Sequence, residues 1–473
     1  MRDDYLLRDA VGLAELVRRR EVSPRELLET AIALAEERND AINALVVPFF
    51  ERAVDEAEEL PEGPFRGVPF LLKDLYAALA GVPLTNGSHL YEGFVPQWTS
   101  EVVERYRRAG LAIFGRTASP EFGVTTTTES RLHGATRNPW NLEHSAGGSS
   151  GGAAAAVAAG IVPAAHASDG GGSIRIPASC CGLVGLKPSR GRVSFGPEQG
   201  EGWAGMSIHH VVSRTVRDSA ALLDVIAGNA PGDPYSAPHQ ERPFREEAGR
   251  DPGRLQVAWT THAFNDVDTD PECVAAVEST ARRLEALGHV VEEARPAIDG
   301  DALADAARVI VGTNLRLGLE QRARQLGKTL EPNDVEPITW STATSVDDRP
   351  LTAYPSAVNM IHAIGRSLGR FFGSWDLLLS PTMPAPPQRI GALALDHPEP
   401  RTFLANLKRT IGYTQLMNAA GNPAISLPLH WSEQGLPVGV QLAAPLGGEP
   451  ALIRVASQLE QAAPWSDRRP AIG

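Results

Sequence analysis

Two glycine-rich turns, each carrying serine, hold the side chains best suited to chemistry. The first turn, residues 147–152, contains Ser149 and Ser150, and the second turn, residues 170–172, leads directly into Ser173. Glycine lets backbone N–H groups point at one spot and lets a side chain sit on a tight turn. This pattern suggests a hydroxyl nucleophile with a site beside it that stabilises an oxyanion.

A serine becomes a nucleophile when a neighbouring base takes its proton. His209 and His210 would point to opposite faces of a strand, which makes them a poor pair of metal ligands, and His166 lies in an alanine-rich stretch typical of a packed core. Lys73 follows the apolar run 68–72, so burial could lower its pKa until it works as a neutral amine. The alternative for Lys73 is a solvated side chain at the end of a strand.

These residues need elements to position them, and the chain alternates short strands with helices. That alternation predicts an α/β protein with a parallel or mixed sheet. Ser23, Pro24 and Glu26 form a good helix start with a capping box, and we expect that helix to end near residue 37. Periodicity predicts further helices over residues 9–20, 101–109, 153–159 and 271–287, and strands over 67–74, 111–115, 255–260 and 289–293.

Composition narrows the class of protein. The formal net charge of −13 argues against a general nucleic-acid binder. Three cysteines, two of them adjacent, are no disulfide framework and favour a reducing compartment. The start lacks the apolar core of a signal peptide, and the window 151–167 is too weak for a membrane span. We therefore expect a cytoplasmic protein that binds neither nucleic acid nor membrane.

The domain organisation expected from composition is one domain over residues 1–473. Residues 229–254 are rich in proline, glycine and charge, which predicts a surface linker. Residues 255–400 would then be a subdomain or insertion packed on the same core.

Three blocks of sequence, in this order, resemble the signature blocks of the amidase signature family. They read GVPFLLKD at 67–74, GGSSGG at 147–152 and DGGGSIRIPA at 169–178. Further similar segments follow in the family's order over almost the whole chain. A single glycine turn would be weak evidence, but three blocks with the Lys, Ser, Ser order and spacing are specific.

The resemblance implies a fold and a catalytic triad. The fold is a large central mixed sheet flanked by helices on both faces. Ser173 would be the nucleophile, Ser149 a bridging serine with a cis peptide bond, and Lys73 the terminal base. The chemistry implied is acyl transfer through a covalent acyl-enzyme, with no metal and no organic cofactor. The backbone N–H groups that match the family's oxyanion hole belong to Gly170, Gly171, Gly172 and Ser173.

Residues beyond the triad are assigned more loosely. Phe122, Trp203, Met206 and Asn314 are candidates for the walls of the substrate pocket. Gly170 departs from the family pattern, because many members carry threonine or another larger residue there. The extra glycine would loosen or open the oxyanion loop, which leaves the substrate class open.

Arg175 allows two interpretations. It could bind a carboxylate of the substrate, or it could form an internal ion pair with Asp169, and the second is favoured. Cys180 and Cys181 follow the nucleophile block and are expected to pack as small apolar side chains.

Three functions compete on these grounds. The first is a stand-alone hydrolase of small linear or cyclic amides, because segments such as GEGW at 200–203 resemble bacterial amidases related to 6-aminohexanoate cyclic-dimer hydrolase. The second resembles the A subunit of glutamyl-tRNA amidotransferase, which needs partner chains. Ile176, where that subunit usually has glutamine, and the acidic charge fit it poorly.

The third function is a nucleotide-binding protein that would use the glycine turns for phosphate. Neither turn fits the phosphate-binding patterns G-x-G-x-x-G or G-x-x-x-x-G-K-[ST]. The partner expected for the leading hypothesis is a small-molecule amide, and a homodimer is one option for its assembly.

Overall fold

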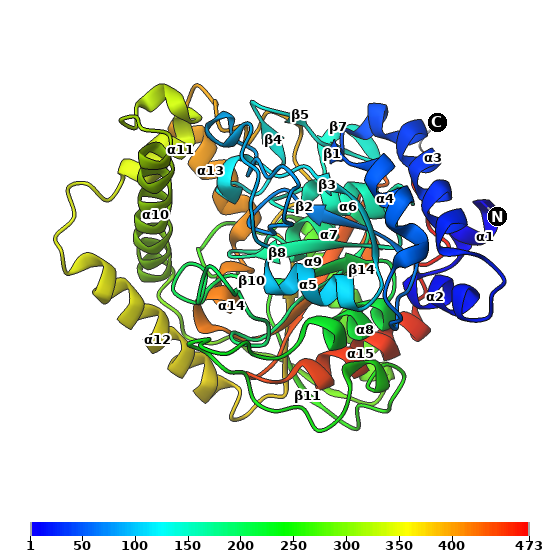
Figure 1. The fold of residues 1–473 in the computed structure, drawn as a ribbon. Helices are drawn as coiled ribbons and strands as arrows, with labels where there is room; N and C mark the ends of the chain where they lie inside the picture. The colour runs from blue at the N-terminus through cyan, green and yellow to red at the C-terminus, as the bar shows by residue number, and fades with distance from the viewer. Residues whose placement is uncertain (1, 472–473) are drawn as a thin grey trace.

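The computed structural model describes residues 2–471, and an eight-stranded mixed sheet forms its centre (Figure 1). β11 pairs in parallel with β12 and β13, and the other neighbours are antiparallel. The predicted mixed sheet is confirmed. In spatial order its strands are β12 (Val290–Glu293), β11 (Gln256–Trp259), β13 (Leu377–Pro381), β15 (Pro437–Ala443), β14 (Ala424–Trp431), β9 (Val184–Lys187), β10 (Ile208–Ser213) and β8 (Ala164–Asp169).

A second sheet carries the lysine of the first signature block. It has the order β1 (Leu45–Pro48), β3 (Ala112–Thr117) and β2 (Pro69–Lys73), with β2 and β3 parallel. All five residues of β2 are buried, as expected for a strand covered on both faces. β2 also packs against β8 at the edge of the large sheet, so the small sheet brings Lys73 to the loops that follow β8.

Helices flank the large sheet on both faces, as predicted (Figure 1). Two very short hairpins, β4 (Glu129–Ser130) with β5 (Gly134–Ala135) and β6 (Arg137–Asn138) with β7 (Asn141–Ser145), lie in the loops. The helices are α1 (Arg2–Leu7), α2 (Ala10–Arg18), α3 (Pro24–Ile42), α4 (Phe50–Glu56), α5 (Glu101–Arg108), α6 (Gly151–Ala158), α7 (Arg175–Cys181), α8 (Val216–Ile226), α9 (Pro271–Ala286), α10 (Gly300–Gln325), α11 (Pro337–Thr344), α12 (Ala353–Phe371), α13 (Pro400–Ile411), α14 (Gln415–Ala420) and α15 (Glu449–Ala462).

The middle of the chain builds the side of the molecule opposite the two termini. α10 packs along α12 there, on the left of Figure 1, while both ends of the chain lie on the right. The intervening strands β11, β12 and β13 extend the large sheet. Residues 229–254 contain the short helix η4 (Phe244–Glu246), whose Phe244 side chain is fully buried. The division into a linker and a subdomain stays a prediction.

The start of α3 follows the sequence signals closely. Ser23 is the N-cap, its side chain accepts from the backbone N–H of Glu26, and the Glu26 carboxylate accepts from the backbone N–H of Ser23. The helix ends at Ile42 rather than near residue 37, because Asn43 supplies the left-handed C-cap with φ of 49°. The capping box was predictable from three residues, whereas the end depended on a single asparagine.

The cysteines pack in the interior. Cys180, Cys181 and Cys273 are all buried, and burial raises the pKa of the Cys180 thiol to about 12. At neutral pH these thiols are protonated and behave as small apolar side chains. Within residues 2–471, no helix has both the length and the apolar composition needed to cross a membrane.

We predict that Ser23→Ala weakens the first turn of α3. The substitution removes the side-chain acceptor for the Glu26 N–H, which should lower the free energy of opening that turn by about 1 kcal/mol. Hydrogen exchange of the first-turn amides measures this. Ser23→Asp, which keeps an acceptor, is the control, and equal protection in all three proteins would contradict the prediction.

Candidate active site

Lys73 ends β2 inside the protein. Its side chain is fully buried, and Nζ lies 2.7 Å from Ser149 Oγ and 3.1 Å from Ser168 Oγ. Burial lowers the pKa of Lys73 to about 7, although the nearby Asp169 carboxylate opposes that shift. An ordinary lysine is almost fully charged at neutral pH, so this burial makes a neutral amine available next to a serine hydroxyl.

Ser149 lies in the first glycine turn, just before α6. The peptide bond between Gly148 and Ser149 is cis, as the resemblance implied. Position 148 has no room for a side chain, because a Cβ there would collide with the backbone of Thr127. From η3 (Glu121–Gly123), Gly123 comes so close that a Cβ on it would lie 3.1 Å from Ser149 Oγ. The serine is thus enclosed by backbone on several sides.

Ser173 lies in the second turn, between β8 and α7. Its exposed fraction is 9%, compared with 2% for Ser149 and 0% for Lys73. Exposure therefore rises in the order Lys73, Ser149, Ser173. Of the three side chains, Ser173 is the one that a molecule arriving from solvent meets first.

A buried ion pair holds the loop that contains Ser173. The Asp169 carboxylate accepts from Nε and Nη2 of Arg175, each at 2.9 Å, and both side chains are fully buried. Burial alone would raise the pKa of Asp169, but the charge and hydrogen bonds of Arg175 hold that pKa well below its usual value. The favoured interpretation of Arg175 is confirmed, because it pairs internally rather than facing a substrate.

The same carboxylate uses one of the N–H groups predicted for the oxyanion hole. The Gly172 N–H donates to Asp169 Oδ1 at 2.7 Å, so its assignment as an oxyanion donor is corrected. Within residues 2–471, no acceptor takes the N–H groups of Gly170, Gly171 or Ser173. Because the Gly172 N–H is already hydrogen-bonded, the N–H groups of Gly170, Gly171 and Ser173 are the donors of this loop that remain available to bind an oxygen.

His166, His209 and His210 are buried and contact one another or backbone groups rather than Ser149 or Ser173. His166 is fully buried, its Nδ1 accepts the backbone N–H of Lys73 at 3.2 Å, and its Nε2 lies 3.1 Å from Nδ1 of His209. Burial lowers the pKa of His166 well below its usual value. His210 contacts the carbonyls of Leu186 and Ser219, away from His209, as expected for neighbours on a strand.

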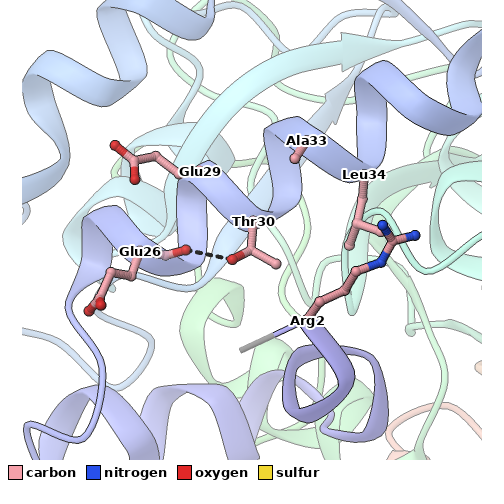
Figure 2. Close-up of a pocket in the computed structure, with 6 residues that line it drawn as sticks. All are labelled: Arg2, Glu26, Glu29, Thr30, Ala33 and Leu34. Carbon is pink, nitrogen blue, oxygen red and sulfur yellow. Dashed lines mark hydrogen bonds between the residues drawn. The ribbon is translucent and has the colours of Figure 1, made fainter.

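A hollow on the outside of the molecule is unrelated to these serines. It has a volume of about 410 Å³ and lies between α1 and α3 (Figure 2). Its walls are the helix-surface side chains Arg2, Glu26, Glu29, Thr30, Ala33 and Leu34. It shares no residue with the Lys73 site. In the part of the chain that the structure describes, no cluster of His, Cys, Asp or Glu is arranged to hold a metal ion.

Comparison with known proteins identifies the family. The sequence matches the family described as Amidase over residues 26–453. The chain belongs to the amidase signature family. It is 41% identical to a 6-aminohexanoate-cyclic-dimer hydrolase of Paenarthrobacter ureafaciens, covering 98% of this chain and 97% of that protein. It is therefore an amidase, a hydrolase of amide bonds.

Solved structures agree with this assignment. The structure of 6-aminohexanoate cyclic dimer hydrolase complexed with substrate superposes with a TM-score of 0.94 at 40% identity, covering 99% of each chain. A bacterial aryl acylamidase of the amidase signature family superposes with a TM-score of 0.88 at 29% identity, covering 97% of each chain. The first relative is similar to this amidase over its full architecture.

The four predicted pocket residues lie in three places. Trp203 contacts Gly170, and the Met206 carbonyl accepts from Asn418, so both approach the oxyanion loop. Phe122 is buried in η3, next to the Gly123 that approaches Ser149. Asn314, on α10, donates to the Ile310 carbonyl at 2.9 Å and contacts the Tyr354 hydroxyl at 3.4 Å. Their role as pocket walls stays a prediction.

Sequence reasoning missed three polar side chains of the site. Ser168 contacts Lys73 Nζ, Thr414 Oγ1 donates to the Gly171 carbonyl at 2.7 Å, and Asn418 Nδ2 donates to Asp169 Oδ1 at 2.8 Å. Ser168 could have been found, because it directly precedes the third signature block. Thr414 and Asn418 come from the far end of the chain, and no local pattern marks them.

We predict that Asp169→Asn strongly destabilises the amidase. The substitution leaves the Arg175 charge buried without its partner and turns an amide N–H toward it, which should cost about 3–5 kcal/mol of unfolding free energy. Urea unfolding measures this. The exposed pair of Arg389 and Glu143 supplies the control, since Glu143→Gln should barely change the midpoint. Equal effects of the two substitutions would contradict the prediction.

Proposed function

We propose that the amidase cleaves amide bonds with Ser173 as nucleophile, Ser149 as proton relay and Lys73 as base. The 2.7 Å approach of Lys73 Nζ to Ser149 Oγ, with the lysine pKa lowered to about 7, carries the proposal. Neutral Lys73 accepts the Ser149 proton while Ser149 accepts the Ser173 proton. The Ser173 oxygen then attacks the amide carbonyl carbon.

The attack puts a negative charge on the carbonyl oxygen. The N–H groups of Gly170, Gly171 and Ser173, which have no acceptor within residues 2–471, are the donors for this charge. A donor of this kind typically contributes about 3–4 kcal/mol to the transition state. The Asp169 and Arg175 pair keeps the loop in place, so these donors need little rearrangement when the charge develops.

Collapse of the tetrahedral intermediate completes the first half of the reaction. The carbon–nitrogen bond breaks, Ser149 passes its proton to the departing amine, and Lys73 returns a proton to Ser149. Water then attacks the ester between Ser173 and the acyl group, and the relay takes its proton. The carbon–oxygen bond to Ser173 breaks, and the relay returns that proton to the Ser173 oxygen. The products are an amine and a carboxylic acid, and the protein recovers its starting protonation state.

For the substrate we propose small linear or cyclic amides, including 6-aminohexanoate cyclic dimer. The support is the 41% identity over nearly the whole chain to a hydrolase named for that dimer. The competing function is the amidotransferase-type subunit, which releases ammonia from glutamine inside a complex. The two differ in whether the chain works alone.

Ser173→Ala should abolish amide hydrolysis while the protein still folds. Loss of the attacking oxygen is expected to lower kcat/KM at least about a thousandfold. A control is Ser119→Ala, because Ser119 is also a buried serine but its hydroxyl bonds only its neighbour's carbonyl, on Pro120. Mass spectrometry of substrate-quenched enzyme should place the acyl group on Ser173. Normal turnover by pure Ser173→Ala protein would exclude the assignment.

Activity should rise with pH through a midpoint near 7. Protonation of Lys73 removes the base, so kcat/KM should fall about tenfold per unit on the acid side. Burial also shifts the pKa values of Lys187 and Glu336 to about 7. The controls Lys187→Met and Glu336→Gln should therefore keep the midpoint. A profile that is flat through neutral pH would contradict a neutral-lysine base.

A substrate panel separates the two functions. We expect the purified chain alone to hydrolyse at least one of these amides: 6-aminohexanoate cyclic dimer, its linear oligomers, an aryl acylamide or an aliphatic amide. The measurement is kcat/KM for each, with Ser173→Ala as the blank. If only glutamine is cleaved, and only when amidotransferase partner subunits are added, the competing function is correct.

A further inference from the structure

Position 170 has no space for a side chain, for a reason that lies outside its own loop. A Cβ placed on Gly170 would lie 2.7 Å from both Cε3 and Cζ3 of Trp203 and 2.8 Å from Ser207 Oγ. Ordinary carbon contacts start near 3.5 Å, so even a methyl group would displace the indole. The indole of Trp203 therefore fills the volume that a side chain at position 170 would need.

The backbone around Trp203 forms a tight turn that hydrogen bonds support. Trp203, Ala204 and Gly205 have successive φ values of 56°, 55° and 74°, three left-handed residues in a row. Residues other than glycine rarely adopt this left-handed backbone conformation, and they keep it only where the surrounding structure holds them there. The Met206 N–H donates to the Trp203 carbonyl at 3.1 Å, and Arg190 Nε donates to the Gly205 carbonyl at 2.7 Å.

One side chain joins this turn to the oxyanion loop. Asn418 Nδ2 donates to the Met206 carbonyl at 3.0 Å and to Asp169 Oδ1 at 2.8 Å. On the other side of the loop, Thr414 Oγ1 donates to the Gly171 carbonyl. The loop thus lies between Thr414 and Trp203, with the indole beside Gly170.

We propose that Trp203 is a specificity-determining wall of the acyl site, standing in for the side chain absent at Gly170. The proposal rests on the function proposed above, because it takes the N–H groups of this loop as the oxyanion site. A carbonyl oxygen bound there places the neighbouring acyl carbon beside the indole. Trp203 is only half-buried, so part of the residue remains accessible to a ligand.

The chemistry of this wall selects the acyl group. An indole is flat, apolar and rigid, so it packs well against an unbranched methylene chain and offers no charge. A branch on the carbon next to the carbonyl would need the volume that the ring fills. The proposed substrates are therefore amides of unbranched aliphatic acids, linear or cyclic.

The first test compares two substrates that differ by one methyl group, hexananilide and 2-methylhexananilide. The parent enzyme should prefer the unbranched amide, and Trp203→Ala should shrink the ratio of the two kcat/KM values by at least about tenfold, the usual discrimination for a methyl group in a tight pocket. Trp203→Phe, which keeps a flat ring, should retain most of the preference. Trp375→Ala, which removes a half-buried indole stacked on Phe371, is the matched control and should leave the ratio unchanged.

The second test examines the contact between positions 170 and 203. Gly170→Ala alone should lower kcat/KM for hexananilide at least about tenfold, because the new Cβ pushes the indole or the loop aside. In the Trp203→Ala background the same substitution should change kcat/KM less than about threefold, since the rigid indole is gone and only the Ser207 hydroxyl, which can rotate away, remains close to the new Cβ. Thermal unfolding of each variant checks that it folds. Losses that simply add in the double variant would overturn the proposal.

The experiments distinguish failure of the role proposed for Trp203 from failure of the proposed catalytic function. If hexananilide hydrolysis survives Ser173→Ala, the nucleophile assignment fails. If Ser173→Ala abolishes hydrolysis but Trp203→Ala leaves the ratio of branched to unbranched amide unchanged, only the role of Trp203 fails.

Discussion

The rest of the site depends on the burial of a single amine, that of Lys73. Lys73 ends a fully buried strand that packs against β8, and its side chain is fully buried. A charged ammonium is costly in such a place, so burial lowers the pKa of Lys73 to about 7 and a substantial share of the amine is neutral near neutral pH. That form is useful only if a hydroxyl is within reach and water is excluded. Ser149 meets both conditions, because its Oγ lies 2.7 Å from Lys73 Nζ and the residue is almost fully buried.

A second buried charge system fixes the loop that must face the substrate. Asp169 binds the Arg175 guanidinium, the Gly172 N–H and the Asn418 amide at once. Replacing such an ion pair by apolar side chains is often neutral for stability, so we attribute to this pair a role in positioning the loop. Asp169, the residue before the glycine turn, binds Asn418, which is about 250 residues away in sequence. It also binds the Gly172 N–H, which helps to fix the conformation of the loop that carries the other donors.

Local signals predicted the parts of this structure that depend on neighbours in sequence. The capping box of α3, the strand that ends at Lys73 and the two glycine turns can all be read from a few adjacent residues. The partners that arrive from elsewhere could not be read in this way. Asn418 makes its contacts from α14, which packs against α12 and α10. The hydrogen bond from the Gly172 N–H depends on the position of the Asp169 carboxylate, which only the folded loop defines.

Gly170 shows how a motif read alone can mislead about shape. An extra glycine in a glycine-rich loop predicts a looser and more open site, since glycine removes both bulk and backbone restriction. In the folded protein the bulk is still present, but Trp203 supplies it from a turn 33 residues later. Interiors are close-packed, so volume given up at one position is taken by another. The side chain beside the loop is therefore a flat ring carried by a different segment, and the backbone donors of the loop do not depend on a side chain at position 170.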